Sequence, residues 1–200
     1  MLSRLSESRI GAIFHSGRII AHIFVEKMME VLCVETINIY GDNRFAEHTK
    51  IREACRGIVI KDGKILLSYE VKTDQWMIPG GGVEEGESYE ICCIRELTEE
   101  TGFLVKPLQH YLTIYEYYED YLYPSHYFIC KVTGQTERML TRREKEVGME
   151  PRWIPLEEAI SVFSKYQDYA DKEEKRGMYL REYKALSAYL NASQCNISAD

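Results

Sequence analysis

Three consecutive glycines, Gly80 to Gly82, stand between a short β-prone run and a helix with a marked start and end. Ser88 is placed to cap the helix N-terminus, and Glu90 follows where a negative charge suits the helix dipole. Gly102 is placed to end the helix. Because glycines lack a Cβ, the loop backbone can approach a ligand closely. The segment therefore predicts a strand, a loop of small residues and a helix in direct succession.

β-prone runs lie on both sides of that helix. Two are separated by Asp62-Gly63, a dipeptide typical of tight β-hairpin turns, and two longer ones should form a hairpin that turns near Pro124-Ser125. The expected strands are 57–60, 65–69, 75–78, 103–118, 126–133 and one that ends at Pro155. Further helices are expected from Leu156 onward and, as a surface helix, over 172–190. Strands interleaved with helices predict an α/β fold, with a mixed β-sheet sandwiched between helices.

The composition limits the class of partner. The formal net charge is −7 and no run of Lys and Arg is dense, which disfavours nucleic acid. None of the six cysteines forms a CxxC motif, so we expect reduced thiols and a cytoplasmic protein. His15, Arg18 and His22 interrupt the apolar run 10–25, which argues against a membrane span. The five histidines form no cluster in the sequence and are assigned no role. An acidic protein that handles an anionic small molecule needs a cation to bring the charges together.

Three carboxylates share one face of the predicted helix. Glu96, Glu99 and Glu100 are spaced i, i+3, i+4. Their mutual repulsion costs a helix about 0.2–0.5 kcal/mol per pair and should raise their pKa values. A divalent cation such as Mg²⁺ would offset the repulsion, because it binds carboxylate oxygens together with water and substrate phosphates. Taken alone, however, an acidic helix face usually faces solvent, and three glycines often form only a turn.

The combination resembles the catalytic box of the Nudix (MutT-like) hydrolase family. That box has a glycine, a glutamate and then an Arg-Glu-apolar-x-Glu-Glu-x-Gly-apolar run at fixed spacing. Every fixed position is matched, by Gly81, Glu87, Arg95-Glu96-Leu97, Glu99-Glu100 and Gly102-Phe103. The segments 76–81 and 153–158 also look like that family, and the resemblance covers residues 56–163. It implies the Nudix fold.

The resemblance implies three regions along the chain. These are an N-terminal extension (1–50), a Nudix hydrolase domain (51–170) and a C-terminal helix and tail (171–200). Within the extension, a packed amphipathic helix and a physiological start at Met28 or Met29 are equally supported.

The activity that the resemblance implies is Mg²⁺-dependent, with Mn²⁺ as an alternative cofactor. Such an enzyme cleaves the diphosphate bond of a nucleoside diphosphate linked to another moiety, NDP-X, into a nucleoside monophosphate and phosphorylated X. The implied metal ligands are Glu96, Glu99, Glu100 and a backbone carbonyl at Gly80 or Gly81, and Glu96 is the general base in some family members. Arg95 and Glu87 would pair with each other and hold the loop against the helix.

Further residues of the implied site come from the glycine loop and from later segments. Gly81 and Gly82 would contact the substrate. Glu146 is preferred to Glu144 as an added loop carboxylate, the alternative being that both are exposed acids. Tyr121 stands where family subgroups that cleave dinucleoside polyphosphates have a tyrosine, although packing of a tyrosine-rich segment also explains it.

Two other functions stay open. A non-catalytic, nucleotide-sensing Nudix-like binding module would usually lack box glutamates, whereas this chain keeps them all. An RNA 5′-end pyrophosphohydrolase is disfavoured by the net charge of −7. The sequence does not distinguish a monomer from a homodimer, and it does not reveal which small-molecule nucleotide is the substrate.

Overall fold

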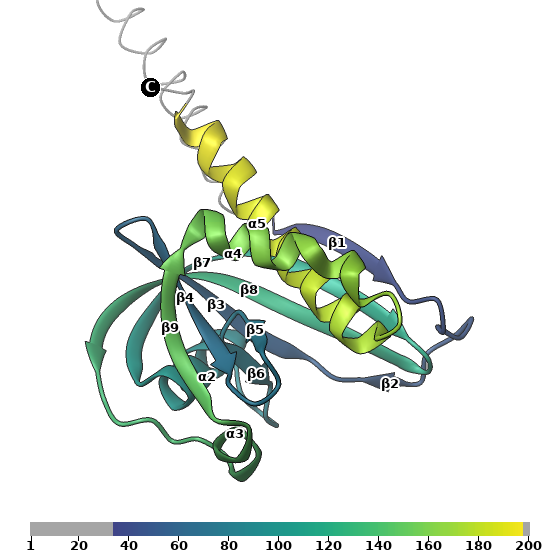
Figure 1. Ribbon diagram of the computed structural model, residues 1–200, viewed down its shortest axis with the longest axis horizontal. Helices are drawn as coiled ribbons and strands as arrows, with labels where there is room; N and C mark the ends of the chain where they lie inside the picture. The colour runs from purple at the N-terminus through teal and green to yellow at the C-terminus, as the bar shows by residue number, and fades with distance from the viewer. Residues whose placement is uncertain (1–33, 198–200) are drawn as a thin grey trace, which may run out of the picture. The chain divides into compact units, whose positions relative to one another are not determined.

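The computed structural model describes residues 34–197, and those from Glu35 onward form one compact unit. The elements of this unit appear in Figure 1. They are β1 (Glu35–Tyr40), β2 (Lys50–Ile51), β3 (Ala54–Lys61), β4 (Lys64–Glu70), β5 (Gln75–Met77), β6 (Gly80–Gly82), α2 (Tyr89–Thr101), β7 (Phe103–Tyr118), β8 (Tyr121–Gln135), α3 (Arg142–Val147), β9 (Met149–Pro155), α4 (Leu156–Ser164), the 3₁₀-helix η1 (Lys165–Tyr169) and α5 (Glu173–Ile197).

The sheet is mixed, as the sequence predicts. Its main path runs β1-β7-β8-β3-β4-β5, while β2 pairs with β8, β6 with β3 and β9 with β4. The pairs β1–β7, β2–β8 and β3–β8 are parallel, and the remaining pairs are antiparallel. Short β6 carries the three glycines and lies directly against β3, which places the glycine loop beside the sheet.

Alternating side chains of the strands enter two separate cores, one on each face of the sheet. Ile58 and Leu67 face the core that α4 and α5 cover, whereas Val59 and Leu66 face the core under α2. The sheet is therefore sandwiched between helices, and the predicted fold class is confirmed (Figure 1). In residues 34–197, no helix combines the length and apolar character needed to cross a bilayer.

The local turn and cap signals are confirmed. Asp62 and Gly63 both adopt positive φ, 50° and 72°, between β3 and β4, as a tight hairpin turn requires. The Ser88 side chain accepts a hydrogen bond from the Ile91 amide at the start of α2. Gly102 adopts the left-handed conformation and donates its amide to the Thr98 carbonyl at the helix end.

The predicted turn of the long hairpin is wrong. The chain reverses at Glu119-Asp120, where Glu119 has φ 47° and Tyr118 pairs with Tyr121. Pro124 lies inside β8, opposite Tyr115 of β7. On its other side it falls between the part of β8 that pairs with β2 and the part that pairs with β3. A strand tolerates a missing N–H where one side has no partner, so proline does not mark a turn here.

Segments on both sides of the expected domain, 51–170, also pack against its sheet. Residues 35–40, placed in the N-terminal extension, form β1 and pair with β7. The expected surface helix is α5, and it buries Tyr179, Ala185 and Leu186 against the sheet. The expected helix is confirmed, and one face of it is more deeply buried than its mixed charges suggested, because some of those charges are paired inside the protein. The helix expected within residues 1–28 lies outside the described residues.

Candidate active site

The glycine loop lies between β3 and α2 and has no room for side chains at two positions. Gly80 has φ 148°, and a Cβ added there would collide with the Cys55 carbonyl oxygen. A Cβ at Gly81 would collide with the carboxylate of Glu96. Glycine is therefore required at both positions, one for backbone conformation and one for contact with an acidic side chain. The loop backbone and the carboxylates of α2 consequently face each other.

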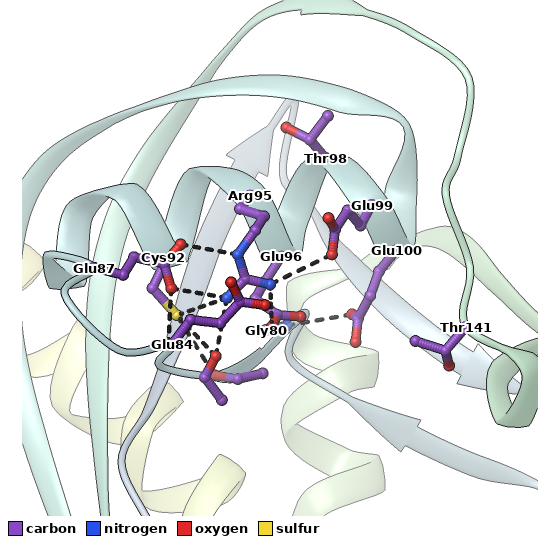
Figure 2. Close-up of polar contacts among 12 residues, drawn as sticks. Gly80, Glu84, Glu87, Cys92, Arg95, Glu96, Thr98, Glu99, Glu100 and Thr141 are labelled. Carbon is purple, nitrogen blue, oxygen red and sulfur yellow. Dashed lines mark hydrogen bonds and ion pairs between the residues drawn. The ribbon is translucent and has the colours of Figure 1, made fainter.

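Arg95 is the centre of an ion network beside this loop. Its guanidinium makes two hydrogen bonds of 2.8 Å to the carboxylate of Glu87 and one of 3.0 Å to the Gly82 carbonyl. It also donates to Glu96 at 2.7 Å and to Glu99 at 3.4 Å. Figure 2 shows these acids around Arg95. The bidentate bond from Arg95 lowers the pKa of Glu87 to about 2. The expected pairing of Arg95 with Glu87 thus holds the loop against α2.

Glu100 points away from Arg95 and into the protein. It is 5% exposed, and its Oε2 accepts hydrogen bonds from the Ser68 hydroxyl at 2.8 Å and the Gly80 amide at 3.2 Å. Burial raises the pKa of Glu100 to about 8, and these two hydrogen bonds oppose the shift. Burial likewise raises the pKa of Glu96. Raised pKa values were expected from mutual repulsion, but the larger cause is desolvation.

Ser68 was not identified from the sequence. It is fully buried, on β4, and holds Glu100 from the sheet side. The signal for it in the sequence was weak, namely a single polar residue at the end of the apolar run Ile65-Leu66-Leu67. A buried hydroxyl in an otherwise apolar strand needs a partner, but the sequence does not show which partner it finds.

The donor set suits a hard divalent cation. Among the described residues, none donates a hydrogen bond to Glu96 Oε2, Glu99 Oε1 or Glu100 Oε1, while the other oxygen of each carboxylate accepts one or more. Carboxylate, carbonyl and water oxygens are ligands that suit Mg²⁺ and Mn²⁺. Within the described part of the chain, no three His, Cys, Asp or Glu side chains already converge in a metal-binding group. A cation would therefore have to draw these acids together, at least partly away from Arg95.

The two candidate loop acids lie on α3 and have different surroundings. Glu146 forms an ion pair of 2.8 Å with Arg142, and both side chains are exposed. Glu144 accepts from the Thr141 amide in a capping box, and its charge contributes to the raised pKa of Glu96. Glu144 therefore lies close enough to Glu96 for its charge to act there, whereas Glu146 is exposed and paired with Arg142.

Tyr121 lies at the start of β8, where β2 pairs with it. Its ring stacks on Tyr123 with the ring centroids 5.2 Å apart, and Lys50 Nζ lies 4.9 Å from the centroid of the Tyr121 ring. These contacts are those of strand packing at the hairpin tip. They do not join Tyr121 to the α2 acids, and its role in binding substrate stays a prediction.

Two histidines do form a cluster, contrary to the sequence-based interpretation. The Thr113 hydroxyl is hydrogen-bonded to His110 Nε2 at 3.0 Å and to His126 Nδ1 at 3.2 Å. His126 is 5% exposed, and Tyr89 of α2 stacks on it at 3.8 Å. Residues 110 and 126 are brought together by the pairing of β7 with β8, which spacing in the sequence did not indicate.

We expect this cluster to make the protein less stable as the pH falls from about 6.5 to about 4. Burial, with a smaller contribution from His110, lowers the pKa of His126 from 6.5 to about 4. The unfolded chain therefore binds the proton first, so the stabilisation is present above pH 6.5 and is lost as the pH falls toward 4. In urea unfolding, the free energy of unfolding should fall less steeply between pH 6.5 and pH 4 for His126→Gln than for wild type. His48→Gln, at an exposed histidine, is the control, and equal slopes in all three proteins would contradict the prediction.

We expect Arg95→Ala to lower both stability and activity. The substitution removes five hydrogen bonds to Glu87, Glu96, Glu99 and Gly82. Hydrogen bonds to charged groups contribute about 1.5–3 kcal/mol, and part of this is screened by solvent at a half-buried site. We therefore expect a loss of about 1–3 kcal/mol in urea unfolding. An unchanged unfolding midpoint would mean that the network does not hold the loop.

The fold and the site define an α/β protein with a carboxylate-bearing helix held against a glycine loop. The family model described as NUDIX domain matches residues 52–179. The chain therefore belongs to the NUDIX family, and the resemblance seen in residues 81–103 is confirmed. The match extends into α5, past the predicted domain end at residue 170.

Individual relatives differ in the substrates that their names give. Diphosphoinositol polyphosphate phosphohydrolase 3-alpha from Mus musculus is 30% identical over 102 residues, which are 51% of this chain and 60% of that protein. RNA pyrophosphohydrolase from Sphingopyxis alaskensis is 38% identical over 61 residues, 28% of this chain and 39% of that protein. A NUDIX hydrolase structure from Nitrosomonas europaea matches with a TM-score of 0.47 and 20% identity, over 68% of this chain and 90% of that one. The chain spans about 60% of the length of the mouse relative.

Proposed function

We propose that this protein is a Mg²⁺-dependent pyrophosphohydrolase that cleaves NDP-X into a nucleoside monophosphate and phosphorylated X. The observation that carries the proposal is the set of three α2 carboxylates, each with one oxygen that accepts no hydrogen bond within residues 34–197. Two of them, Glu96 and Glu100, lie against the backbone of Gly81 and Gly80. Membership of the NUDIX family supports it. The net charge of −7 disfavours binding of a diphosphate without a cation, and carboxylate oxygens together with substrate phosphates are ligands of Mg²⁺.

In this proposal the residues of the box have separate tasks. Glu96, Glu99 and Glu100, with the carbonyl of Gly81, would hold Mg²⁺, or Mn²⁺ in its place. Bound divalent cations neutralise a diphosphate and make water a better nucleophile at neutral pH. In the alternative role that some family members use, Glu96 would instead accept a proton from the attacking water, and burial, which raises its pKa, would make it a stronger base. Gly82 gives the diphosphate room, because no side chain projects from it.

Arg95 has a supporting task. Its two hydrogen bonds to Glu87 fix the guanidinium, and its bond to the Gly82 carbonyl ties the loop to α2. When the α2 acids bind cations, Glu87 still holds Arg95 in place. Glu87 would thus keep the positive charge of Arg95 beside the α2 acids both with and without bound cations.

A substrate panel with and without Mg²⁺ tests the proposal. It should contain ADP-ribose, nucleotide sugars, dinucleoside polyphosphates, 8-oxo-dGTP and RNA with a 5′-triphosphate. Hydrolysis of the diphosphate bond that requires Mg²⁺ and is fastest with an NDP-X compound supports the proposal. Binding of nucleotides without turnover of any compound would favour a nucleotide-sensing module instead, and preference for RNA would favour the 5′-end activity.

A diphosphoinositol polyphosphate is a second candidate substrate. The mouse relative is named for that substrate. In addition, α3 presents exposed Arg142, Arg143 and Lys145 next to Glu144, in a protein that is otherwise acidic. These positively charged side chains near the α2 acids would favour a substrate with many phosphates. The panel should therefore include this compound, measured at two salt concentrations, because such attraction weakens with salt.

We expect Glu144→Gln to slow turnover more than Glu146→Gln does. Glu144 contributes to the electrostatic environment of Glu96, whereas Glu146 is paired with Arg142 in solvent. Both lie on the same short helix, so each variant is the matched control of the other. Steady-state kinetics at saturating Mg²⁺ measures the difference. A larger loss for Glu146→Gln would restore the preference that the sequence suggested, and two unchanged variants would remove the loop acid from the site.

A further inference from the structure

Four charged residues are enclosed between α5 and the sheet, on the face opposite α2. Arg181 donates to Glu116 at 3.0 Å and to Glu182 at 2.8 Å, and Tyr127 donates to Glu182 at 2.9 Å. Arg56 lies 3.8 Å from Glu182. Glu182 is fully buried, and Glu116 is 3% exposed. We call these five residues the α5 network. Its two positive and two negative charges balance, so it leaves no net charge for an ionic ligand.

Arg56 connects the α5 network to the glycine loop. Its Nη1 donates to the Ile78 carbonyl at 3.2 Å, and its backbone pairs with Gly80 across β3 and β6. Ile78 is fully buried, so its carbonyl has no water to replace this donor. Two residues further along, the Gly80 amide donates to Glu100. One guanidinium therefore faces Glu182 of α5 and also fixes the segment that presents an amide to Glu100.

Glu182 is the acid that keeps Arg56 in this position. No other carboxylate among the described residues forms an ion pair with Arg56. The buried Nε of Arg56 has no hydrogen-bond partner among residues 34–197, and the hydrogen bond that the guanidinium makes within that range comes from Nη1. Removing the counter-ion of a buried cation destabilises its position, because an uncompensated charge is left in the interior. Loss of the charge on Glu182 should therefore weaken the hydrogen bond from Arg56 to the Ile78 carbonyl. The effect would reach a segment more than 100 residues before Glu182 in the sequence.

We propose that Glu182 is a positioning residue, which acts through Arg56 to hold the segment 78–80 in the geometry that Glu100 requires. The structural part of this inference stands without any activity, and its catalytic consequence rests on the proposed function. Helix α5 then does more than cover the sheet, because one of its charges sets the geometry of the glycine loop. Glu182 itself touches neither the α2 acids nor the loop.

Hydrogen exchange in the metal-free protein tests the structural part. Glu182→Gln keeps the size of the side chain and an acceptor for Tyr127 but loses the charge. Glu116→Gln is the matched control, because Glu116 is also buried and pairs with the same Arg181. Among the described residues Glu116 forms no ion pair with Arg56, whose charge acts on it only from a longer distance. The measured quantity is the exchange rate of the Gly80 amide divided by that of the Val59 amide in the middle of β3, which reports global opening.

We expect this ratio to rise about five-fold in Glu182→Gln, the factor that corresponds to a lost hydrogen bond of about 1 kcal/mol. It should be unchanged in Glu116→Gln, even if both variants melt earlier. An unchanged ratio in Glu182→Gln, or an equal rise in both variants, would overturn the proposal. Should Glu182→Gln fail to fold, Arg56→Lys serves in its place, since Lys keeps the charge but lacks the planar guanidinium. The same five-fold rise is expected there, and its absence would count against the proposal.

A second measurement separates the positioning role from the proposed function. In the hydrolysis assay, Glu182→Gln should raise the Mg²⁺ concentration needed for half-maximal activity, whereas Glu116→Gln should leave it as in wild type. A change of kcat alone, alike in both variants, would indicate a purely structural effect and overturn the catalytic part. If wild type hydrolyses none of the substrates, the proposed function fails, and the exchange ratios still decide the structural part.

Discussion

Glu99→Gln and Glu100→Gln should each lower turnover by more than about 100-fold while the protein stays folded. Within residues 34–197, each side chain has one carboxylate oxygen that accepts no hydrogen bond; Glu100 accepts from the Gly80 amide, and Glu99 is joined to the network of Arg95. Loss of residues that only support metal ligands typically costs 10- to 100-fold, so loss of a ligand should cost more. Initial rates at saturating Mg²⁺ measure the effect. Wild-type turnover in either variant would remove the assignment of these residues as ligands.

Two controls make that result specific to the metal. Glu90→Gln changes an exposed glutamate of the same helix and should retain wild-type turnover. Thermal melting of wild type and Glu100→Gln, each with EDTA and with excess Mg²⁺, then tests binding directly. A cation that binds only the folded site raises its stability with the logarithm of the concentration. Mg²⁺ should therefore raise the melting temperature of wild type more than that of Glu100→Gln, and equal shifts would place the cation elsewhere.

The helix and its acids could be predicted because their signals are local. Ser88 and Gly102 mark the two ends of α2 within the sequence itself, and the spacing of Glu96, Glu99 and Glu100 fixes their shared helix face. The pairing of Arg95 with Glu87 joins residues only eight positions apart. Short-range patterns of this kind do not depend on the rest of the fold.

The parts that were missed depend on strand pairing and on the docking of α5. His110 and His126 meet only because β7 and β8 pair in that register. Ser68 reaches Glu100 across 32 positions. Turn propensity also misled, since Pro124 occupies a strand position whose second side has no partner. In each case a tertiary contact decided the outcome, and no pattern within a short window encodes it.

Helix α5 is the clearest example. Arg181 and Glu182 look like solvent-facing charges in the sequence, yet Arg181 is 9% exposed and Glu182 is fully buried. Their partners are as far away as Glu116, 65 positions earlier. A charge can be buried when its partner and its hydrogen bonds are buried with it. The sequence showed the charges, but it did not show the pairs that allow their burial.

Arg181→Ala should consequently lower the free energy of unfolding by about 3–5 kcal/mol, because it leaves Glu116 and Glu182 buried without their nearest cation. Urea unfolding at neutral pH measures the change. Arg142→Ala is the matched control. It removes the same kind of side chain from a pair with Glu146, but the Arg142 side chain is 93% exposed. Exposed pairs contribute little, and the control should stay within about 0.5 kcal/mol of wild type.

A second substitution shows whether the loss comes from the uncompensated charge. In Arg181→Met, Glu116 is left buried with no cation at hydrogen-bond distance, so the protein should be strongly destabilised. Adding Glu116→Leu removes that charge as well, and stability should recover in part, because well-packed apolar residues can replace a buried ion pair at little cost. Glu182 keeps Arg56 and Tyr127 as partners in the double variant. A double variant less stable than Arg181→Met would mean that packing around Glu116, and not its charge, determines the stability of this layer.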